Sequence, residues 1–299
     1  MIYSFLEQHG IDRLTCIVAT HPDTDHIGGL SGALQAASVE SAYCTVTDND
    51  TEAFRDFKKY LEQQNKEIIV PNAGDSFRLG SAEVTFLYPK AGMLINDNTS
   101  VVVRIVYGDT SFLFMGDCEA GDESVMLASD CELQSTVLKI AHHGSEDASS
   151  ERFLQRVKPV YAVISVGRDN GYGHPNSSVL MQLQEGEAEL YRTDMHGTIR
   201  CISDGIHVVF ETEKHPEYDP YMIAGGYGTF LAMQKDASDR TTEDAEETVR
   251  YIANRNTKKF HYPWCSSVLD IKESNKWPFT GTREELIEMG YVPCKRCNP

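Results

Sequence analysis

Short apolar runs alternate with segments whose apolar residues recur every three or four positions over roughly the first quarter of the chain. In Thr51–Gln64 the apolar side chains return at helical spacing and charged side chains fill the positions between them, which predicts an amphipathic helix. The same reasoning predicts a second helix at Leu30–Ser38 and strands at Leu14–Ala19, Ser41–Val46 and Glu67–Val70.

The middle of the chain has the pattern of antiparallel strands. Apolar and polar residues alternate, and glycine-containing turns such as Tyr107-Gly108-Asp109-Thr110 separate the runs. The predicted strands are Ser76–Leu79, Glu83–Tyr88, Ser100–Tyr107 and Ser111–Met115.

Helical and strand patterns alternate again after residue 118. Helices are predicted at Glu119–Ser129, Ser149–Val157 and Ser177–Glu185, and strands at Thr136–Ala141, Val160–Ser165 and Glu189–Tyr191. A hairpin of Thr198–Ile202 and His207–Thr212, turned at Asp204-Gly205, ends this region. The order of elements predicts a layered α/β domain over residues 1–212.

The periodic pattern weakens over residues 213–255. Glycines at 225, 226 and 228 and an acidic run from 236 to 247 are typical of a linker. Residues 256–299 then form a distinct module rich in cysteine and basic residues, so the sequence predicts a domain, a linker and a small module.

The charge of the chain is unevenly distributed. The sequence has 27 basic and 45 acidic residues, a net charge of −18. Seven basic and five acidic residues lie in 256–299, which leaves 20 basic and 40 acidic residues in the remainder. Such an acidic body repels a polyanion at long range, which counts against a nucleic-acid substrate.

Composition favours a globular protein of a reducing compartment. The hydrophobic fraction is 41%, and the sequence lacks the run of about 18 apolar residues that a membrane helix needs. Met1–Gln8 has no signal-peptide pattern, so we expect a cytoplasmic protein. Most of the five scattered cysteines, Cys16, Cys44, Cys118, Cys131 and Cys201, are expected to be small buried residues.

A cluster of metal-binding residue types follows the first predicted strand. The segment His21-Pro22-Asp23-Thr24-Asp25-His26 places two imidazoles and two carboxylates within six residues. Pro22 stiffens the loop, and Gly28-Gly29 lets the backbone pass close to it. This density of ligands suits a pair of divalent metal ions.

The cluster resembles the H-x-[HD]-x-D-H motif of the metallo-β-lactamase superfamily. Later segments match as a set: Phe112–Asp117 is a strand ending in Gly-Asp, Val137–Ser145 is a strand ending in paired histidines, and Gly171–Pro175 follows the strand that ends near Ile164. Over about residues 11–210, the chain is similar to the hydrolase domain of the ComEC/Rec2 competence family. The resemblance implies an αββα sandwich and a hydrolytic site with two divalent ions, Zn or Mn.

Carried over to this sequence, the resemblance gives each ligand a place. His21 and Asp23 would bind one ion, Asp25 and His26 the other, and Asp117 would bridge both. His142 or His143 would complete the second ion's set. Neighbours on a strand face opposite ways, so we expect one of them to bind the metal and the other to support it. Asp25, Asp117 and His174 are the expected catalytic residues.

Some positions keep more than one interpretation. His174 is a plain turn residue, a phosphate contact or the general acid for the leaving group. Ser145 and Asn176 are candidate substrate contacts. Many superfamily members have a further histidine before Gly-Asp, whereas residues 96–100 have none, so one ion would have fewer ligands.

The resemblance also implies more chain before the first motif. Superfamily members have a β-hairpin there, whereas only about twenty residues precede His21. Missing N-terminal strands or a partner chain would then complete the sheet and cover its exposed edge.

The last 44 residues contain a second set of metal ligands. His261, Cys265, Cys294 and Cys297 have the form H-x3-C…C-x2-C, which suits one structural zinc ion. The segments 256–263, 279–286 and 290–299 resemble the Ada-type zinc-binding module, in which the first ligand is a methyl-accepting cysteine. His261 takes that place here and lacks thiolate chemistry.

The tail also presents candidate DNA contacts. Basic and aromatic side chains that could meet phosphates and bases are Lys258, Lys259, Lys272, Lys276, Lys295, Arg296, Trp264 and Trp277. The alternative is a solvated basic surface.

The leading hypothesis is a metal-dependent phosphodiesterase acting on DNA. The alternatives are a small-molecule ester or lactone hydrolase, and a DNA-binding protein with an impaired site.

Overall fold

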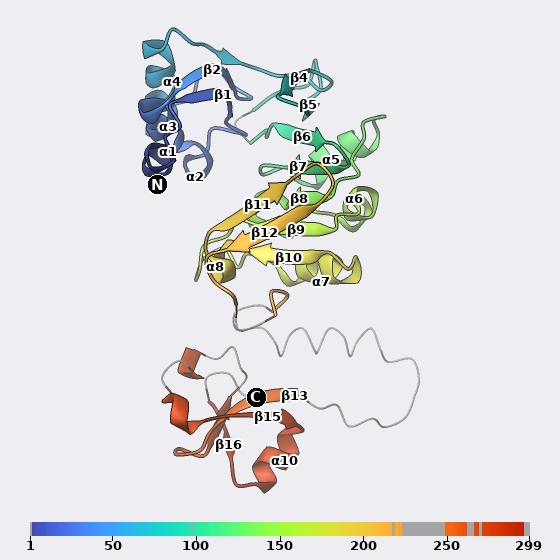
Figure 1. Cartoon of the computed structure of the whole chain (residues 1–299). Coiled ribbons are helices and arrows are strands. Elements are labelled where there is room, and N and C mark those ends of the chain that lie inside the picture. The colour runs from blue at the N-terminus through green and yellow to red at the C-terminus, as the bar shows by residue number, and fades with distance from the viewer. Residues whose placement is uncertain are drawn as a thin grey trace. The chain divides into compact units, whose positions relative to one another are not determined.

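The computed structural model describes residues 2–96, 98–216, 219–222, 249–261, 266–268 and 271–295. It divides into two compact units, residues 1–215 and 216–299 (Figure 1). In the part of the chain that is described, no helix has the length and apolar character needed to cross a bilayer.

A small parallel sheet carries the first part of unit one. Its strands are β1 (Arg13–Val18), β2 (Ser38–Tyr43) and β3 (Ile68–Ile69), in that order. Helices α1 (Ile2–Gln8), α3 (Leu30–Ala36) and α4 (Glu52–Gln63) lie on one side of it (Figure 1). The Thr51 hydroxyl caps α4 by accepting the Phe54 N–H, and the apolar face of α4 buries Phe54, Phe57 and Leu61.

A seven-stranded sheet forms the second layer, ordered β10-β9-β8-β7-β6-β5-β4. Its strands are β4 (Ser76–Leu79), β5 (Ala82–Tyr88), β6 (Val102–Tyr107), β7 (Thr110–Phe114), β8 (Val137–Lys139), β9 (Tyr161–Ile164) and β10 (Glu189–Arg192). Strands β4 to β7 run antiparallel and β7 to β10 run parallel.

Helices α5 (Ala120–Leu127), α6 (Glu151–Val157) and α7 (Ser177–Glu185) connect the parallel strands. Crossover connections between parallel strands have one hand, so these helices share one side of the sheet (Figure 1).

The opposite face of the large sheet packs against the small sheet and a hairpin. Val18 and Tyr43, at the ends of β1 and β2, pack against Val84, Phe86 and Val103. The hairpin consists of β11 (Ile199–Ser203) and β12 (Val208–Thr212). Phe210 stacks on Tyr191, with the ring centres 4.0 Å apart. The two sheets lie between the layer of α1, α3 and α4 and the layer of α5, α6 and α7, which is the helix–sheet–sheet–helix arrangement that was predicted (Figure 1). The short helices α2 (Thr24–Ile27) and α8 (Thr193–His196) lie in loops after β1 and β10.

Three predicted boundaries are wrong, two of them for identifiable reasons. The strand predicted at Ser41–Val46 is β2, which starts at Ser38 because its parallel register pairs Ser38 with Arg13. The strand predicted to run to Ala141 ends at Lys139, because the backbone turns into a 3-10 segment, η1 (Ala141–Gly144). The helix predicted at Leu30–Ser38 ends at Ala36.

Among the described residues β1 has a partner on one side only, and the additional strands or partner chain stay a prediction.

Unit two contains a four-stranded sheet ordered β15-β13-β14-β16. The strands are β13 (Val249–Asn254), β14 (Lys259–His261), β15 (Lys276–Gly281) and β16 (Val292–Pro293), with α10 (Arg283–Glu288), η2 (Ser266–Val268) and η3 (Glu273–Asn275). Tyr251, Ala253, Phe260, Leu286 and Tyr291 form its core. Strand β13 lies within the range predicted as a linker, and its six residues pair with β15.

A buried carboxylate joins α5 to α6. Glu123 is fully buried and accepts hydrogen bonds from Ser149 N at 2.6 Å and from Ser150 N at 3.0 Å, at the start of α6. Burial raises the pKa of Glu123, and the hydrogen bonds from Ser149 and Ser150 oppose that rise. The carboxylate therefore satisfies backbone N–H groups that have no partner inside the helix.

The substitution Glu123→Ala should destabilise unit one by about 3 kcal/mol, because two backbone N–H groups lose their acceptor. Urea unfolding followed by the helical circular dichroism signal measures this. Glu40→Ala is the matched control: Glu40 forms an exposed ion pair with Arg13 and should change stability by less than about 1 kcal/mol. Equal losses in the two variants would contradict the assigned role of Glu123.

Candidate metal centre

The predicted ligands follow the carboxyl ends of three strands. The loop after β1 carries His21–His26, the loop after β7 carries Asp117, and the loop after β8 carries His142 and His143. Strands β7 and β8 are parallel neighbours, so their ends share one edge of the sheet. Val101 N donates to Thr20 O at 2.7 Å, which joins the β1 loop to the residues before β6.

His21 is the most deeply buried of these residues, at 1% exposure. Its Nδ1 lies 3.2 Å from Ser100 Oγ and 3.1 Å from Thr20 Oγ1, while its Nε2 lies 3.7 Å from both Asp23 Oδ2 and Asp117 Oδ2. Burial, and then the charge of His26, lowers the pKa of His21. The ring is therefore held neutral, which is the state that binds a metal.

Gly116 sets the position of Asp117. Its φ is +55°, and a Cβ there would lie 2.7 Å from Ser100 Oγ, so the turn requires glycine. Asp117 N donates to Ser100 Oγ at 2.9 Å. Burial alone would raise the pKa of Asp117, but the hydrogen bond from His26 and the charges of His26, His21 and His143 bring it to about 2.

The paired histidines lie in a turn and not on a strand. Both have positive φ, 47° at His142 and 54° at His143, so the argument from alternating strand faces was wrong. His143 Nδ1 lies 2.7 Å from Ser165 O. A carbonyl only accepts, so Nδ1 carries the proton and the lone pair of the neutral ring is on Nε2.

His143 Nε2 points to the other ligands. It lies 3.2 Å from Asp25 Oδ2 and 3.2 Å from His26 Nε2. His142 points elsewhere: its Nε2 is 3.9 Å from Asp117 Oδ2, and its ring meets the ring of His174 edge to face at 5.7 Å. His142 belongs to neither ligand group described next.

Two groups of side chains have ligand atoms close enough to hold one ion each. The inner group is His21, His26 and Asp117, and the outer group is Asp25, His26 and His143. The two groups share His26. Asp23 lies outside both, with its side chain 58% exposed.

The charges around His26 fit metal ions. Three atoms lie 3.2 to 3.4 Å from His26 Nε2: Asp117 Oδ1, His143 Nε2 and Asp25 Oδ2. One imidazole proton cannot satisfy all three acceptors. Within the described ranges the ion pairs of Asp25 and Asp117 are all with histidines, and Asp117 Oδ1 is buried without a hydrogen bond of good geometry. This donor set suits divalent cations.

His174 lies beside the ligands in the loop between β9 and α7. Burial, and then the charges of His142 and His143, lowers its pKa. A neutral ring is a weak general acid near neutral pH but remains a hydrogen-bond donor. The other two candidate contacts have local partners. Asn176 caps α7 by accepting Ser178 N, and Ser145 Oγ accepts Asp147 N at 3.4 Å.

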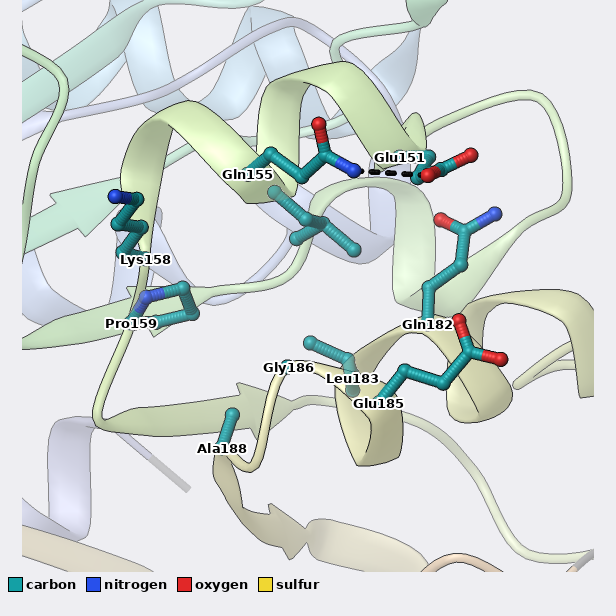
Figure 2. A pocket seen from close by; sticks show the side chains of 10 residues that line it. Glu151, Gln155, Lys158, Pro159, Gln182, Leu183, Glu185, Gly186 and Ala188 are labelled. Carbon is teal, nitrogen blue, oxygen red and sulfur yellow. Dashed lines mark hydrogen bonds between the residues drawn. The ribbon is translucent and has the colours of Figure 1, made fainter.

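A cavity of about 270 Å³ opens next to the outer group. It is lined by Asp25, His143, Ser165, Val166, Gly167, Asn170, Tyr172 and His174. Figure 2 shows a different cavity, of about 340 Å³, between the facing sides of α6 and α7. Its lining includes Glu151 and Glu185 but no histidine, cysteine or aspartate, so it is not the metal centre.

Three features of the site were not predicted. The hydroxyls of Thr20 and Ser100 orient His21, and the carbonyl of Ser165 orients His143. Lys139 lies just before η1, and burial lowers its pKa to about 8, against the opposing charge of Asp117. A hydroxyl or a carbonyl within a strand or loop has no sequence signature, so these contacts need coordinates.

The second set of predicted ligands lies partly within the described residues. His261 ends β14 and Cys294 follows β16, and these strands pair in parallel with Phe260 opposite Pro293. Both side chains are buried, and His261 Nδ1 has no hydrogen-bond partner. Cys265 and Cys297, like Trp264 and Arg296, lie outside the described residues.

The two histidines of η1 should differ in their effect on metal binding. His143→Ala should weaken Mn²⁺ binding by more than the roughly 10- to 100-fold that is typical for a residue supporting a ligand, because it removes a ligand atom. His142→Ala should stay within that range. Calorimetric titration of the metal-free protein measures both, and a larger loss for His142→Ala would reverse the assignment.

The chain is similar to proteins of bacterial competence. It is 29% identical over 203 residues to ComE operon protein 3 of Bacillus subtilis, a match that covers 67% of this chain and 26% of that protein. It is 31% identical over 204 residues to competence protein ComA of Neisseria gonorrhoeae, covering 65% and 26%. The chain thus matches about a quarter of the length of these relatives.

Among solved structures, the metallo-β-lactamase fold protein YhfI of Bacillus subtilis is 14% identical, with a TM-score of 0.41, and the match covers 60% of this chain and 74% of that one. The sequence model of the family described as "Metallo-beta-lactamase superfamily" matches residues 4–168. This match covers more than half of the chain, and the chain belongs to the metallo-β-lactamase superfamily.

Proposed function

We propose that the chain is a divalent-metal-dependent phosphodiester hydrolase whose substrate is DNA. The observation that carries this proposal is the pair of ligand groups that share His26; Asp117 belongs to the inner group, and its Oδ2 lies 3.8 Å from His143 Nε2 of the outer group. Two divalent ions held there would supply an acidified water molecule and positive charge for a phosphate group. No serine, cysteine or threonine nucleophile is required.

The residues of the chain have distinct tasks in this proposal. Asp117 faces both groups, since its Oδ2 lies 3.7 Å from His21 Nε2 and its Oδ1 lies 3.2 Å from His26 Nε2. Asp25 lines the cavity, where one carboxylate oxygen would hold the outer ion and the other would be free to accept a proton from the attacking water. His174, on the same cavity, donates a hydrogen bond to the phosphate or to the leaving oxygen.

The choice of DNA rests on relatives and on the tail. The names of the relatives refer to competence, and a further one, of Haemophilus influenzae, is "Recombination protein 2", a process on DNA. In unit two Lys258 Nζ lies 4.6 Å from the centre of the Tyr291 ring, and the Arg255 guanidinium 5.9 Å from Trp277. Tyr291 is buried in the core and Trp277 is partly buried, so it is the exposed Lys258 and Arg255 side chains that would meet phosphates.

The acidic body favours a different substrate class. With 40 acidic and 20 basic residues outside the last 44, a small ester or lactone would meet less repulsion than DNA. Turnover of small carboxylic esters without cleavage of DNA or phosphodiesters would select this alternative. Metal binding without any turnover would select an impaired DNA-binding protein.

The chain should cleave plasmid DNA in the presence of Mn²⁺ or Zn²⁺ and lose this activity in EDTA. Asp117→Asn should lower kcat by on the order of 100-fold or more, because it removes the charge that faces both ligand groups. Gel assays and a chromogenic phosphodiester measure this. Asp48→Asn, at an exposed aspartate paired with Lys58, is the matched control and should keep full activity. Equal cleavage by Asp117→Asn and wild type would refute the site.

The tail module is proposed to hold one structural zinc ion. His261 and Cys294 lie side by side at the ends of paired strands, and the free Nδ1 of the buried His261 needs a partner. Cys265 and Cys297 would complete a tetrahedral set. The zinc would stabilise a module whose described residues form only small apolar clusters, the larger of them built on Tyr251, Ala253, Phe260, Leu286 and Tyr291.

Removal of a tail ligand should lower bound zinc without changing the hydrolase site. Cys294→Ser should reduce zinc by about one equivalent per chain in metal analysis and should unfold unit two, because the module depends on the ion. Both tryptophans of the chain lie in the tail, so tryptophan fluorescence reports that unfolding. Cys201→Ser, at a partly buried cysteine on β11 of unit one, is the control for loss of a thiol. Full zinc content in Cys294→Ser would exclude this assignment.

A further inference from the structure

The loop between β9 and α7 presents one aromatic ring to solvent beside the metal centre. The side chain of Tyr172 is 86% exposed, although an aromatic ring gains free energy when it is buried. Its one ring contact is with His174, with ring centres 5.8 Å apart and planes 28° from parallel. The other face of the ring has no stacking partner among the described residues.

Hydrogen bonds within the loop fix the backbone of Tyr172. The Asn170 amide donates to Gly167 O at 3.0 Å and to His174 O at 2.6 Å. Its carbonyl oxygen accepts Tyr172 N at 3.2 Å and His174 N at 3.1 Å. Arg168 ties the same loop to Asp194 O. The backbone that carries the exposed ring is therefore ordered before any ligand binds, and the ring itself rests on His174, which lowers the entropy cost of binding.

The ring also lies at the right place for a substrate. Tyr172 and His174 line the cavity of about 270 Å³ together with the exposed Asp25 and the partly buried His143 of the outer ligand group. A phosphate held at that group would have its neighbouring nucleoside within the reach of Tyr172. An aromatic ring with a free face stacks on any base, because every base has a π-face.

We propose that Tyr172 is the platform on which the base next to the cleaved phosphodiester stacks. This inference rests on the proposed phosphodiesterase function and adds a specificity determinant to it. It predicts that the enzyme distinguishes phosphodiesters that carry a base from those that do not. The Asn170 side chain is the positioning group that holds the platform.

The first test compares two substrates with the same leaving group. Thymidine 5′-(p-nitrophenyl phosphate) carries a base, and methyl p-nitrophenyl phosphate does not. In the metal-loaded wild type, kcat/KM should favour the thymidine ester. Tyr172→Ala should reduce that preference about tenfold, mostly through KM, whereas Tyr172→Phe and Tyr172→Trp should keep it because stacking needs only the ring.

Phe5→Ala is the matched control. Phe5 is also an exposed aromatic ring stacked on a histidine, His9, but it lies on α1 and lines none of the cavity at the metal centre. Its removal should leave the substrate preference unchanged. An unchanged preference in Tyr172→Ala, or an equal loss in Phe5→Ala, would overturn the role of Tyr172.

A binding measurement separates this inference from the proposed function. Fluorescence anisotropy with a labelled single-stranded oligonucleotide, and with the same oligonucleotide made abasic, needs no turnover. The base-bearing strand should bind more tightly than the abasic strand. Tyr172→Ala should reduce the ratio of the two dissociation constants about tenfold. If both esters are cleaved but the two strands bind alike, the platform is refuted while the hydrolase stands. If neither ester is cleaved but the difference in binding persists, the function fails and the platform stands.

Discussion

The hydroxyl of Ser100 lies between the loop that follows β1 and the loop that follows β7, and it has a hydrogen-bond contact with each. It accepts the N–H of Asp117 and lies 3.2 Å from His21 Nδ1. These two loops follow strands of different sheets, which also meet through the apolar contacts of Val18 and Tyr43 and through the hydrogen bond from Val101 N to Thr20 O. The Ser100 hydroxyl thus helps to set the distance from His21 Nε2 to Asp117, and Gly116 is required because any side chain would displace it.

In the outer group, too, a single oxygen atom orients a histidine. His143 is oriented by the main-chain oxygen of Ser165, which follows β9, and its own backbone conformation is left-handed. The ligand therefore depends on the packing of three neighbouring parallel strands and not on a side-chain partner that a substitution could remove. The body of the domain is acidic, yet the site concentrates histidines around its carboxylates. Local chemistry and overall charge consequently favour different substrate classes.

The sequence was informative where chemistry leaves a pattern. The segment His21–His26, the Gly-Asp pair and the paired histidines are recognisable because ligand types at fixed spacing are rare by chance, and the structure brings most of them together. Asp23 and His142 show the limit of that reasoning, since spacing does not tell which way a side chain turns. The conformation of η1 depends on positive φ angles at His142 and His143, and residue preferences for helix, strand or turn do not predict such angles at histidines. Strand β13 was missed because its short alternation follows a long acidic run, and only its pairing with β15 makes it a strand.

The difference in depth between His21 and Asp25 has a kinetic consequence. The side chain of His21 is 2% exposed and that of Asp25 is 65% exposed, so an ion at the inner group would be more shielded from solvent than an ion at the outer group. The inner ion would load first and exchange slowly, while the outer ion would equilibrate with the surrounding medium. A chelator would accordingly remove the two ions in separate phases. A chain that carries only one ion in this site would hold it in the inner group, beside His21.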